Sequence, residues 1–254
     1  MRSPEHLALL EELDQGGTLV EVAGGFAVAR EPRGIRLGDV PDPSSALVAA
    51  LLKVAPHSTG IEGAGEPAGR FAEAWSVATG KQFREVGGVR LYRLTELRPP
   101  RAVGTPRLAE AADVPACAEW LDEMGRAEDE RRGWVPGDRA ADLAAAVHKL
   151  IEAHRLWLLE VDGEPVTLGA HRPALRGVVR LGPIYTPATH RRHGYGTAMT
   201  AHLAQLFHPQ TQVCLRTDLG NPDSHRVYQR LGFTPVTDLR RFTADPPHHP
   251  SAPI

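Results

Sequence analysis

The sequence predicts an α/β fold with a mixed sheet, and three patterns along the chain indicate it. Short runs of β-branched and aliphatic residues alternate with segments in which apolar residues recur every three or four positions, the spacings of strands and of amphipathic helices. The pairs Gly24-Gly25 and Asp162-Gly163 separate neighbouring strand candidates and are typical of hairpin turns. A glycine-containing loop joins the strand candidate Val178–Tyr185 to a helix pattern.

Residues 1–98 are expected to form a smaller N-terminal α/β domain. Ser3 and Pro4 are suited to start its first helix, and Gly80 to end its third. The expected helices are Ser3–Leu13, Pro43–Ala55 and Ala68–Thr79, and the expected strands are Thr18–Val22, Phe26–Arg30, His57–Ile61 and the two arms of a hairpin within Phe83–Leu97, turning at Gly87-Gly88.

A linker rich in proline and glycine is expected at residues 99–104, followed by a second α/β domain at residues 105–243. Asp113 and Asp138 are candidate N-caps of its first two helices. Its expected strands are Pro106–Ala111, Leu156–Val161, Pro165–His171, Val178–Tyr185, Gln212–Thr217 and Pro235–Phe242. The tail 244–254 is rich in proline and histidine and is expected to be disordered.

Composition restricts the range of functions. The chain has 254 residues, of which 42% are hydrophobic and 24% charged, and a net charge of −2. This balance gives no electrostatic reason to expect nucleic acid or a membrane surface as a partner. Cys117 and Cys214 fall on apolar faces and are expected to be buried thiols, and the pair His248-His249 is weak evidence for a metal, so no metal site is predicted. Without a membrane-spanning run or a signal-peptide pattern, a cytoplasmic protein is expected, as a monomer or homodimer.

The loop after Val178–Tyr185 has the features of a phosphate-binding turn. It reads RRHGYG from Arg191 to Gly196 and precedes an amphipathic helix. Glycines let backbone N–H groups approach a phosphate closely, and the helix dipole favours negative charge there. The Walker motif is excluded because Gly196 is followed by Thr-Ala, and the dinucleotide motif is excluded because only G-x-G is present.

The remaining pattern, R-x-x-G-x-G between a strand and a helix, resembles the acyl-CoA pyrophosphate loop of the GNAT superfamily of N-acetyltransferases. A second stretch, N-P-x-S-x-x-x-Y-x-x-L-G-F from Asn221 to Phe233, resembles the other half of the same site. In this stretch Asn221 or Ser224 is suited to cap a helix, and Gly232 to end it. The resemblance covers residues 105–242 and implies a GNAT-like fold in which two central strands splay apart.

The resemblance also implies an activity, namely the transfer of an acetyl group from acetyl-CoA to an amine of a small molecule or protein, directly in a ternary complex. The backbone of Ile184, Tyr185 and Thr186 would pair with the pantetheine arm, and one N–H near Tyr185 would bind the thioester oxygen. If the loop were misassigned, Ile184 and Tyr185 would be ordinary strand core. Around the pyrophosphate the implied binding residues are Arg191, Arg192, His193, Gly194, Tyr195, Gly196 and Thr197.

On the second helix of the motif, Tyr228 occupies the position where the superfamily usually places a tyrosine beside the CoA sulfur. A phenol can donate a proton or a hydrogen bond to a departing thiolate, so Tyr228 is the candidate general acid. The alternative is a tyrosine that only packs against the helix base. Asn221 would either reach the CoA or cap the helix, and the sequence does not separate these roles.

The general base is not assigned by the sequence. An amine must lose a proton before or during its attack on the thioester. The superfamily has no fixed position for this group, and a chain of water molecules often serves. The candidates are Glu128, Glu130, Glu160 and His171, and for each of them a place on the solvated surface is the competing interpretation.

Other hypotheses remain open. The N-terminal half repeats the order of elements of the C-terminal half but lacks R-x-x-G-x-G between His57 and Arg70, so it is either a degenerate acyltransferase-like domain or an unrelated α+β cap. The chain as a whole is either an enzyme or a non-catalytic acyl-CoA sensor that kept the loop, although retention of Tyr228 argues for turnover. A longer acyl group and a protein lysine as acceptor are further alternatives.

Overall fold

The computed structural model describes residues 6–31, 34–132 and 140–244, which form two compact units. The first unit comprises the described residues up to 91 together with 217–220 and 235–244, and the second comprises 92–132, 140–216 and 221–234. Three strands, β5 (Phe83–Leu94), β10 (Gln212–Asp218) and β11 (Phe233–Ala244), therefore have residues in both units. The expected division into domains 1–98 and 105–243, joined by the linker 99–104, stays a prediction.

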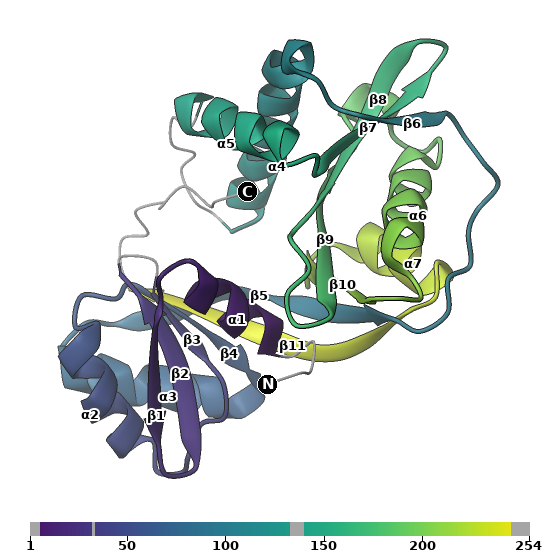
Figure 1. The fold of residues 1–254 in the computed structure, drawn as a ribbon. Coiled ribbons are helices and arrows are strands. Elements are labelled where there is room, and N and C mark those ends of the chain that lie inside the picture. The colour runs from purple at the N-terminus through teal and green to yellow at the C-terminus, as the bar shows by residue number, and fades with distance from the viewer. Residues whose placement is uncertain (1–5, 32–33, 133–139, 245–254) are drawn as a thin grey trace. The chain divides into compact units, whose positions relative to one another are not determined.

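The first unit is a sheet with helices on its faces (Figure 1). Its strand order is β1-β2-β3-β4-β11-β5, with β3 and β4 parallel and with antiparallel pairs β1–β2, β2–β3 and β4–β11. Its remaining elements are α1 (Leu7–Asp14), β1 (Thr18–Val22), β2 (Gly25–Arg30), β3 (Gly34–Leu37), α2 (Ser45–Val54), β4 (Gly60–Ala64) and α3 (Gly65–Thr79).

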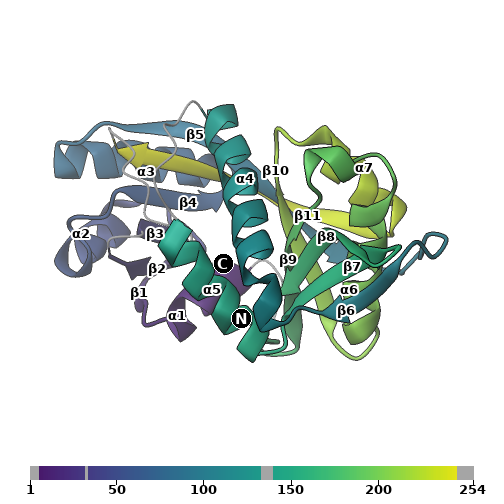
Figure 2. The same ribbon diagram turned by 90° about the horizontal axis from the view of Figure 1, so that it is seen from above.

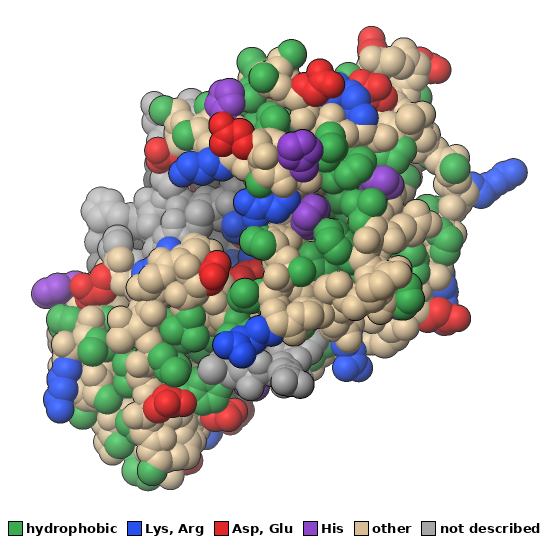
Figure 3. Space-filling view, viewed as in Figure 1, with side chains coloured by type: hydrophobic (Ala, Val, Ile, Leu, Met, Phe, Trp, Pro, Cys, Tyr) green, Lys and Arg blue, Asp and Glu red, His purple; other side chains and the backbone are tan. Residues whose placement is uncertain are grey.

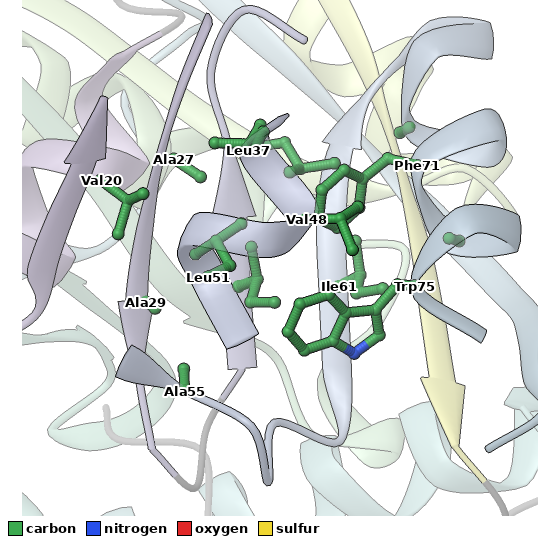
Figure 4. Packing of buried hydrophobic residues seen from close by; sticks show 14 of the residues in the cluster. Val20, Ala27, Ala29, Leu37, Val48, Leu51, Ala55, Ile61, Phe71 and Trp75 are labelled. Atoms are coloured by element: carbon green, nitrogen blue, oxygen red, sulfur yellow. The ribbon is translucent and has the colours of Figure 1, made fainter. Parts of the chain in front are cut away.

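The core of the first unit lies between its sheet and the helices α2 and α3. Leu47 and Leu51 are one turn apart on α2, and Phe71 and Trp75 are one turn apart on α3; all four side chains are fully buried. Figure 4 shows Leu51, Phe71 and Trp75 pointing toward strand residues such as Ile61. Burial of an apolar stripe spaced by three to four residues is what holds an amphipathic helix on a sheet.

Several predictions for the first unit are confirmed. The strands β1 and β2 and the helices α2 and α3 fall on the predicted segments, and α3 ends at Gly80 in the left-handed conformation. The strand predicted at His57–Ile61 begins later, at Gly60, and β3 was not predicted. The predicted helix start at Ser3 and Pro4 lies outside the described residues.

The hairpin predicted within Phe83–Leu97 is wrong, because Phe83–Leu94 is one continuous strand. Gly87 and Gly88 lie inside it rather than at a turn. A Cβ atom on Gly88 would stand 2.4 Å from the backbone oxygen of Leu239, so the glycine permits a close approach of β5 to β11. A glycine pair inside an alternating pattern indicates either a turn or such an approach, and here it marks the approach.

In the second unit the strand order is β10-β9-β8-β7-β6, with α6 on one face and α4 and α5 packed together on the other. Figures 1 and 2 show α6 and the α4–α5 pair on opposite sides of these strands. The elements are β6 (Thr105–Leu108), a 3₁₀ turn at Ala111–Asp113, α4 (Val114–Arg132), α5 (Ala140–Glu152), β7 (Leu156–Val161), β8 (Glu164–His171), β9 (Val178–Tyr185), a 3₁₀ turn at Ala188–His190, α6 (Tyr195–Phe207), β10 (Gln212–Asp218) and α7 (Pro222–Arg230).

The start of α4 differs from the prediction. Asp113 is not the N-cap; it lies three residues into a helical turn whose N-cap is Glu110, and its carboxylate accepts a hydrogen bond from the Glu110 N–H at 2.7 Å. Glu110 and Asp113 form a reciprocal capping box, a pattern in which either acid can look like the first cap from sequence alone. The predicted cap Asp138 and the tail from residue 245 onward lie outside the described residues.

The surface agrees with the near-neutral charge. On the face shown in Figure 3, basic and acidic side chains lie interspersed. Within the part of the chain that the structure describes, no helix combines the length and apolar character needed to cross a membrane.

We predict that Gly169→Ala destabilises the second unit. Gly169 lies in β8 beneath α6, where an added Cβ would come within 2.4 Å of Met199 Cγ and 2.9 Å of Leu203 Cδ1. Overpacking of this kind typically costs about 1–3 kcal/mol. Urea unfolding should show a lower midpoint with an unchanged slope, and an unaltered midpoint would contradict the packing described here.

Candidate active site

Strand β9 loses one of its two neighbours halfway along its length. It pairs in parallel with β10 from Val178–Gln212 to Leu181–Leu215, and no pair between these strands follows in the described register. The end of β9 keeps its other neighbour, β8, through Gly169–Ile184 and Leu168–Tyr185. The predicted splay of the two central strands is thus confirmed, and it leaves one backbone edge of β9 open beyond Leu181.

An irregularity accompanies the splay. The register between β8 and β9 shifts between Gly169 and His171, and Gly182 of β9 has a φ of +120°. Residues with a Cβ atom rarely adopt this backbone conformation, so glycine is favoured at this position. An unpaired strand edge can accept an extended ligand as an added strand.

The loop that follows β9 forms a concave backbone surface. Arg192 has a φ of +68° and Gly194 a φ of +83°, so two left-handed residues alternate with others just before α6. The first hydrogen bond of α6 runs from the Ala198 N–H to the Gly194 oxygen at 2.9 Å. The N–H groups of Tyr195, Gly196 and Thr197 therefore project from the N-terminus of the helix, an arrangement that binds anions.

The two glycines of the loop have different roles. A Cβ on Gly194 would meet nothing within 4 Å, so this glycine is required by its backbone conformation and its surroundings are open. A Cβ on Gly196 would stand 3.3 Å from Thr186 Oγ1, so the start of α6 lies close to the end of β9. The loop and the open strand edge are therefore neighbours.

A buried hydroxyl holds the end of β9. Thr167 of β8 is fully buried, and its Oγ1 lies 2.6 Å from the Tyr185 oxygen and 2.7 Å from Thr186 Oγ1. Because a hydroxyl has one proton, Thr167 donates to the Tyr185 oxygen and accepts from Thr186. Thr167 was missed in the sequence, where a threonine inside a strand carries no distinguishing signal.

Arg191 also holds the end of β9. Its Nε donates to the Thr186 oxygen at 3.0 Å and its Nη2 to Tyr185 Oη at 3.2 Å, and its guanidinium lies 5.7 Å from the centre of the Tyr185 ring. Arg192 and His193 are exposed. Arg191 thus fixes the end of β9 in this structure, and a contribution of either arginine to phosphate binding stays a prediction.

The Tyr185 side chain lies on the α4 side of the sheet. Its Oη donates to Glu123 Oε2 at 2.9 Å. Burial and the neighbouring Glu123 carboxylate raise the pKa of Tyr185, so its proton stays in place at neutral pH. Glu123 was also missed, because nothing in its sequence surroundings separates it from the other acids of α4.

Tyr228 is positioned by α7. Asn221 is the N-cap of this helix, and its side chain accepts from the Ser224 N–H at 3.2 Å, so the structure gives Asn221 the capping role. The half-buried Tyr228 ring packs edge-on against Tyr92 and Phe233. Burial raises the pKa of Tyr228 to about 12, although a hydrogen bond with Ser224 acts in the opposite direction.

Behind Tyr228 lies a residue from β5. Tyr92 is completely buried, its Oη lies 2.8 Å from His225 Nδ1, and its ring contacts those of His225 and Tyr228. Tyr92 therefore links β5 to the helix that carries Tyr228. The alternating pattern of the strand around Tyr92 predicts a core position for this residue but does not predict its contact with His225 or Tyr228.

The candidate bases from the sequence lie in other surroundings. Glu160 accepts from Arg107 Nε at 2.6 Å, within a group of ion pairs that includes Asp113. His171 packs against Phe207 at the C-terminal end of α6, the end opposite the loop, and burial lowers its pKa. Glu128 is half-buried on α4, and the Glu130 side chain lies outside the described part.

Residues 114–233, which include the loop, the open strand edge and α7, match the model of the Acetyltransferase (GNAT) family. The chain carries a GNAT acetyltransferase domain. The match spans the loop and the second motif from which the resemblance was inferred, and it supports acyltransferase activity.

Solved structures extend the likeness of fold beyond the GNAT domain. A GCN5-related N-acetyltransferase from Kribbella flavida aligns over 96% of this chain and 95% of its own, with a TM-score of 0.63 and 19% identity. An acetyltransferase of the GNAT family from Colwellia psychrerythraea aligns over 96% and 98%, with a TM-score of 0.60 and 13% identity. At these identities the likeness concerns the fold alone, and no curated protein matches the chain.

We predict that Gly194→Val abolishes binding of desulfo-CoA. Valine at a φ of +83° strains the backbone by an amount on the order of 1–3 kcal/mol, and its side chain would occupy the open space in front of the N–H groups. Binding is measured by calorimetric titration.

Gly163→Val is the matched control for backbone strain. Gly163 has a φ of +80° and equally open surroundings, but it lies in the turn between β7 and β8. The Gly163→Val variant should lower the unfolding midpoint about as much as Gly194→Val does, and it should leave binding of desulfo-CoA intact. Equal binding by both variants would show that the loop does not hold the ligand.

The raised pKa of Tyr228 predicts a late alkaline titration. Relative to the ordinary value of 10.0, the folded chain should hold this proton until pH approaches about 12. Its contribution to stability is then complete below pH 10 and is lost as pH rises toward 12, because the unfolded chain ionises first. The difference in phenolate absorbance between wild type and Tyr228→Phe should have its midpoint near 12; a midpoint near 10 would contradict the burial of this hydroxyl.

Proposed function

We propose that the GNAT domain transfers an acetyl group from acetyl-CoA to an amine by direct transfer in a ternary complex. The observation that carries the proposal is the juxtaposition of an anion-binding helix N-terminus with an open strand edge. The helix N-terminus suits a pyrophosphate, and the open strand edge suits an extended arm with amide groups. The match of residues 114–233 to the Acetyltransferase (GNAT) family supports acyl transfer as the reaction class.

The residues that would hold acetyl-CoA form a continuous path. The backbone N–H groups from His193 to Thr197 would bind the pyrophosphate, with charge contributed by Arg191 and Arg192. The backbone of Ile184, Tyr185 and Thr186 would pair with the pantetheine arm along the edge that β10 leaves open. When bound, acetyl-CoA would supply the acetyl group as a thioester.

Two groups would assist the transfer. The N–H near Tyr185 would stabilise negative charge on the thioester oxygen. As the amine nitrogen forms the C–N bond and the C–S bond breaks, the amine gives up its proton and the departing sulfur requires one. Tyr228, which remains protonated at neutral pH, would donate a hydrogen bond or its proton to that sulfur.

Calorimetric titration with acetyl-CoA, desulfo-CoA and ATP tests the proposed site. We expect binding of both CoA compounds and no response to ATP, with one molecule bound per chain. A stoichiometry of two would assign a working site to the N-terminal half as well. Absence of CoA binding would overturn the proposed function, and CoA binding without release of free thiol in the presence of any amine would favour the non-catalytic sensor.

We predict that Tyr228→Phe lowers kcat on the order of ten- to a thousand-fold, because the departing sulfur loses its donor. Binding of desulfo-CoA should be nearly unchanged, since the ring and its packing against Tyr92 and Phe233 are retained. Release of CoA thiol under saturating substrate measures kcat. A wild-type rate in this variant would leave Tyr228 with a packing role only.

A further inference from the structure

We infer that Glu123 is the residue that receives the amine acceptor, in its ammonium form. This inference rests on the proposed function and adds the charge of the substrate and the residue that recognises it. It is carried by the contact between Glu123 and Tyr185 at the end of β9.

The position of Glu123 connects it to the reacting end of the strand. Tyr185 is the residue whose backbone is proposed to face the thioester, and its side chain reaches α4, where it donates to Glu123 Oε2. The neighbouring residue Ile184 packs with the core on the α6 side, whereas Tyr185 packs with the core on the α4 side. Glu123 therefore stands on the face of β9 opposite the helix that begins at the anion-binding loop.

The electrostatic state of Glu123 suits a cationic ligand. Its carboxylate is exposed, and its only partner among the described residues is a neutral phenol. Two other acids of the second unit have basic partners: Asp122 accepts from Arg126 Nε at 2.6 Å, and Glu160 accepts from Arg107 Nε at the same distance. The nearby cation Arg191 donates to the Tyr185 hydroxyl and not to Glu123, so one carboxylate oxygen of Glu123 is left to accept from an ammonium group.

The surrounding hydrogen bonds hold this carboxylate in place. Arg191 Nη2 donates to Tyr185 Oη, so the single phenol proton is directed toward Glu123. Oε2 is thereby occupied, while Oε1 accepts nothing from the described residues. An ammonium group has three N–H donors, and one of them bound at Oε1 would bring the nitrogen beside Tyr185.

The experiment compares Glu123→Gln with the wild type on a panel of amines. The charged probes are methylamine, spermidine, lysine amide and a peptide with a free N-terminus, and aniline is the probe that is uncharged at neutral pH. Acetyl-CoA turnover is followed by thiol release. For the best charged probe we expect Glu123→Gln to raise KM about ten- to a hundredfold, the usual worth of a hydrogen bond between charged groups, with a smaller change in kcat.

Two variants separate recognition from general effects. Glu119→Gln removes the same charge from an exposed position one turn earlier on α4, and it should change KM less than twofold. Tyr185→Phe removes the hydroxyl that fixes Glu123 and should raise KM by less than Glu123→Gln does. Binding of desulfo-CoA should be the same in the wild type, Glu123→Gln and Glu119→Gln.

The outcomes are distinguishable from failure of the proposed function. If the wild type binds no acetyl-CoA, the proposed function itself fails. If acetyl-CoA binds and turns over but Glu123→Gln matches the wild type, or Glu119→Gln has an equal effect, the role of Glu123 is overturned. If acetyl-CoA binds and only aniline or none of the charged amines is acetylated, a cationic acceptor is overturned while the CoA site stands.

Discussion

The termination of pairing between β9 and β10 after Leu181 and Leu215 is the constraint on which the site depends. A strand that leaves its neighbour exposes backbone groups that need partners. Side chains supply some of them: Thr167 donates to the Tyr185 oxygen and Arg191 to the Thr186 oxygen. The end of β9 is thereby fixed without a second strand, and its free edge remains available next to the N-terminus of α6.

A second group of contacts holds the helix that carries Tyr228. Asn221 caps α7, and Tyr92 joins His225 and Tyr228 on that helix to β5. The aromatic rings of Tyr92 and Phe233 pack against Tyr228 and restrict how its ring can turn. In the proposed role of Tyr228 as a proton donor, so high a pKa would make rigid placement of the ring beside its acceptor matter more than its intrinsic acidity.

The sequence was most informative where the determining contacts are local. The loop with its glycines and the cap at Asn221 depend on residues a few positions apart in the sequence. The strand Val178–Tyr185 has its predicted bounds, and a helix follows the loop as predicted. Glu123, which meets Tyr185 across 62 positions, and Tyr92, which meets His225 across 133, were not predicted. The hairpin predicted at Gly87-Gly88 was wrong for the same reason, because the strand that approaches Gly88 is β11, which lies about 150 positions later in the sequence.

The register shift between β8 and β9 determines which side chains at the end of β9 face α6 and which face α4. Along a strand, successive side chains point to opposite faces, and a displacement by one residue exchanges them. The irregularity next to Gly182 comes immediately before Ile184 and Tyr185, and beyond it Ile184 packs on the α6 side and Tyr185 on the α4 side. Without that shift the phenol would point away from Glu123, so the same backbone feature that accompanies the open edge also sets the face from which an acceptor would approach.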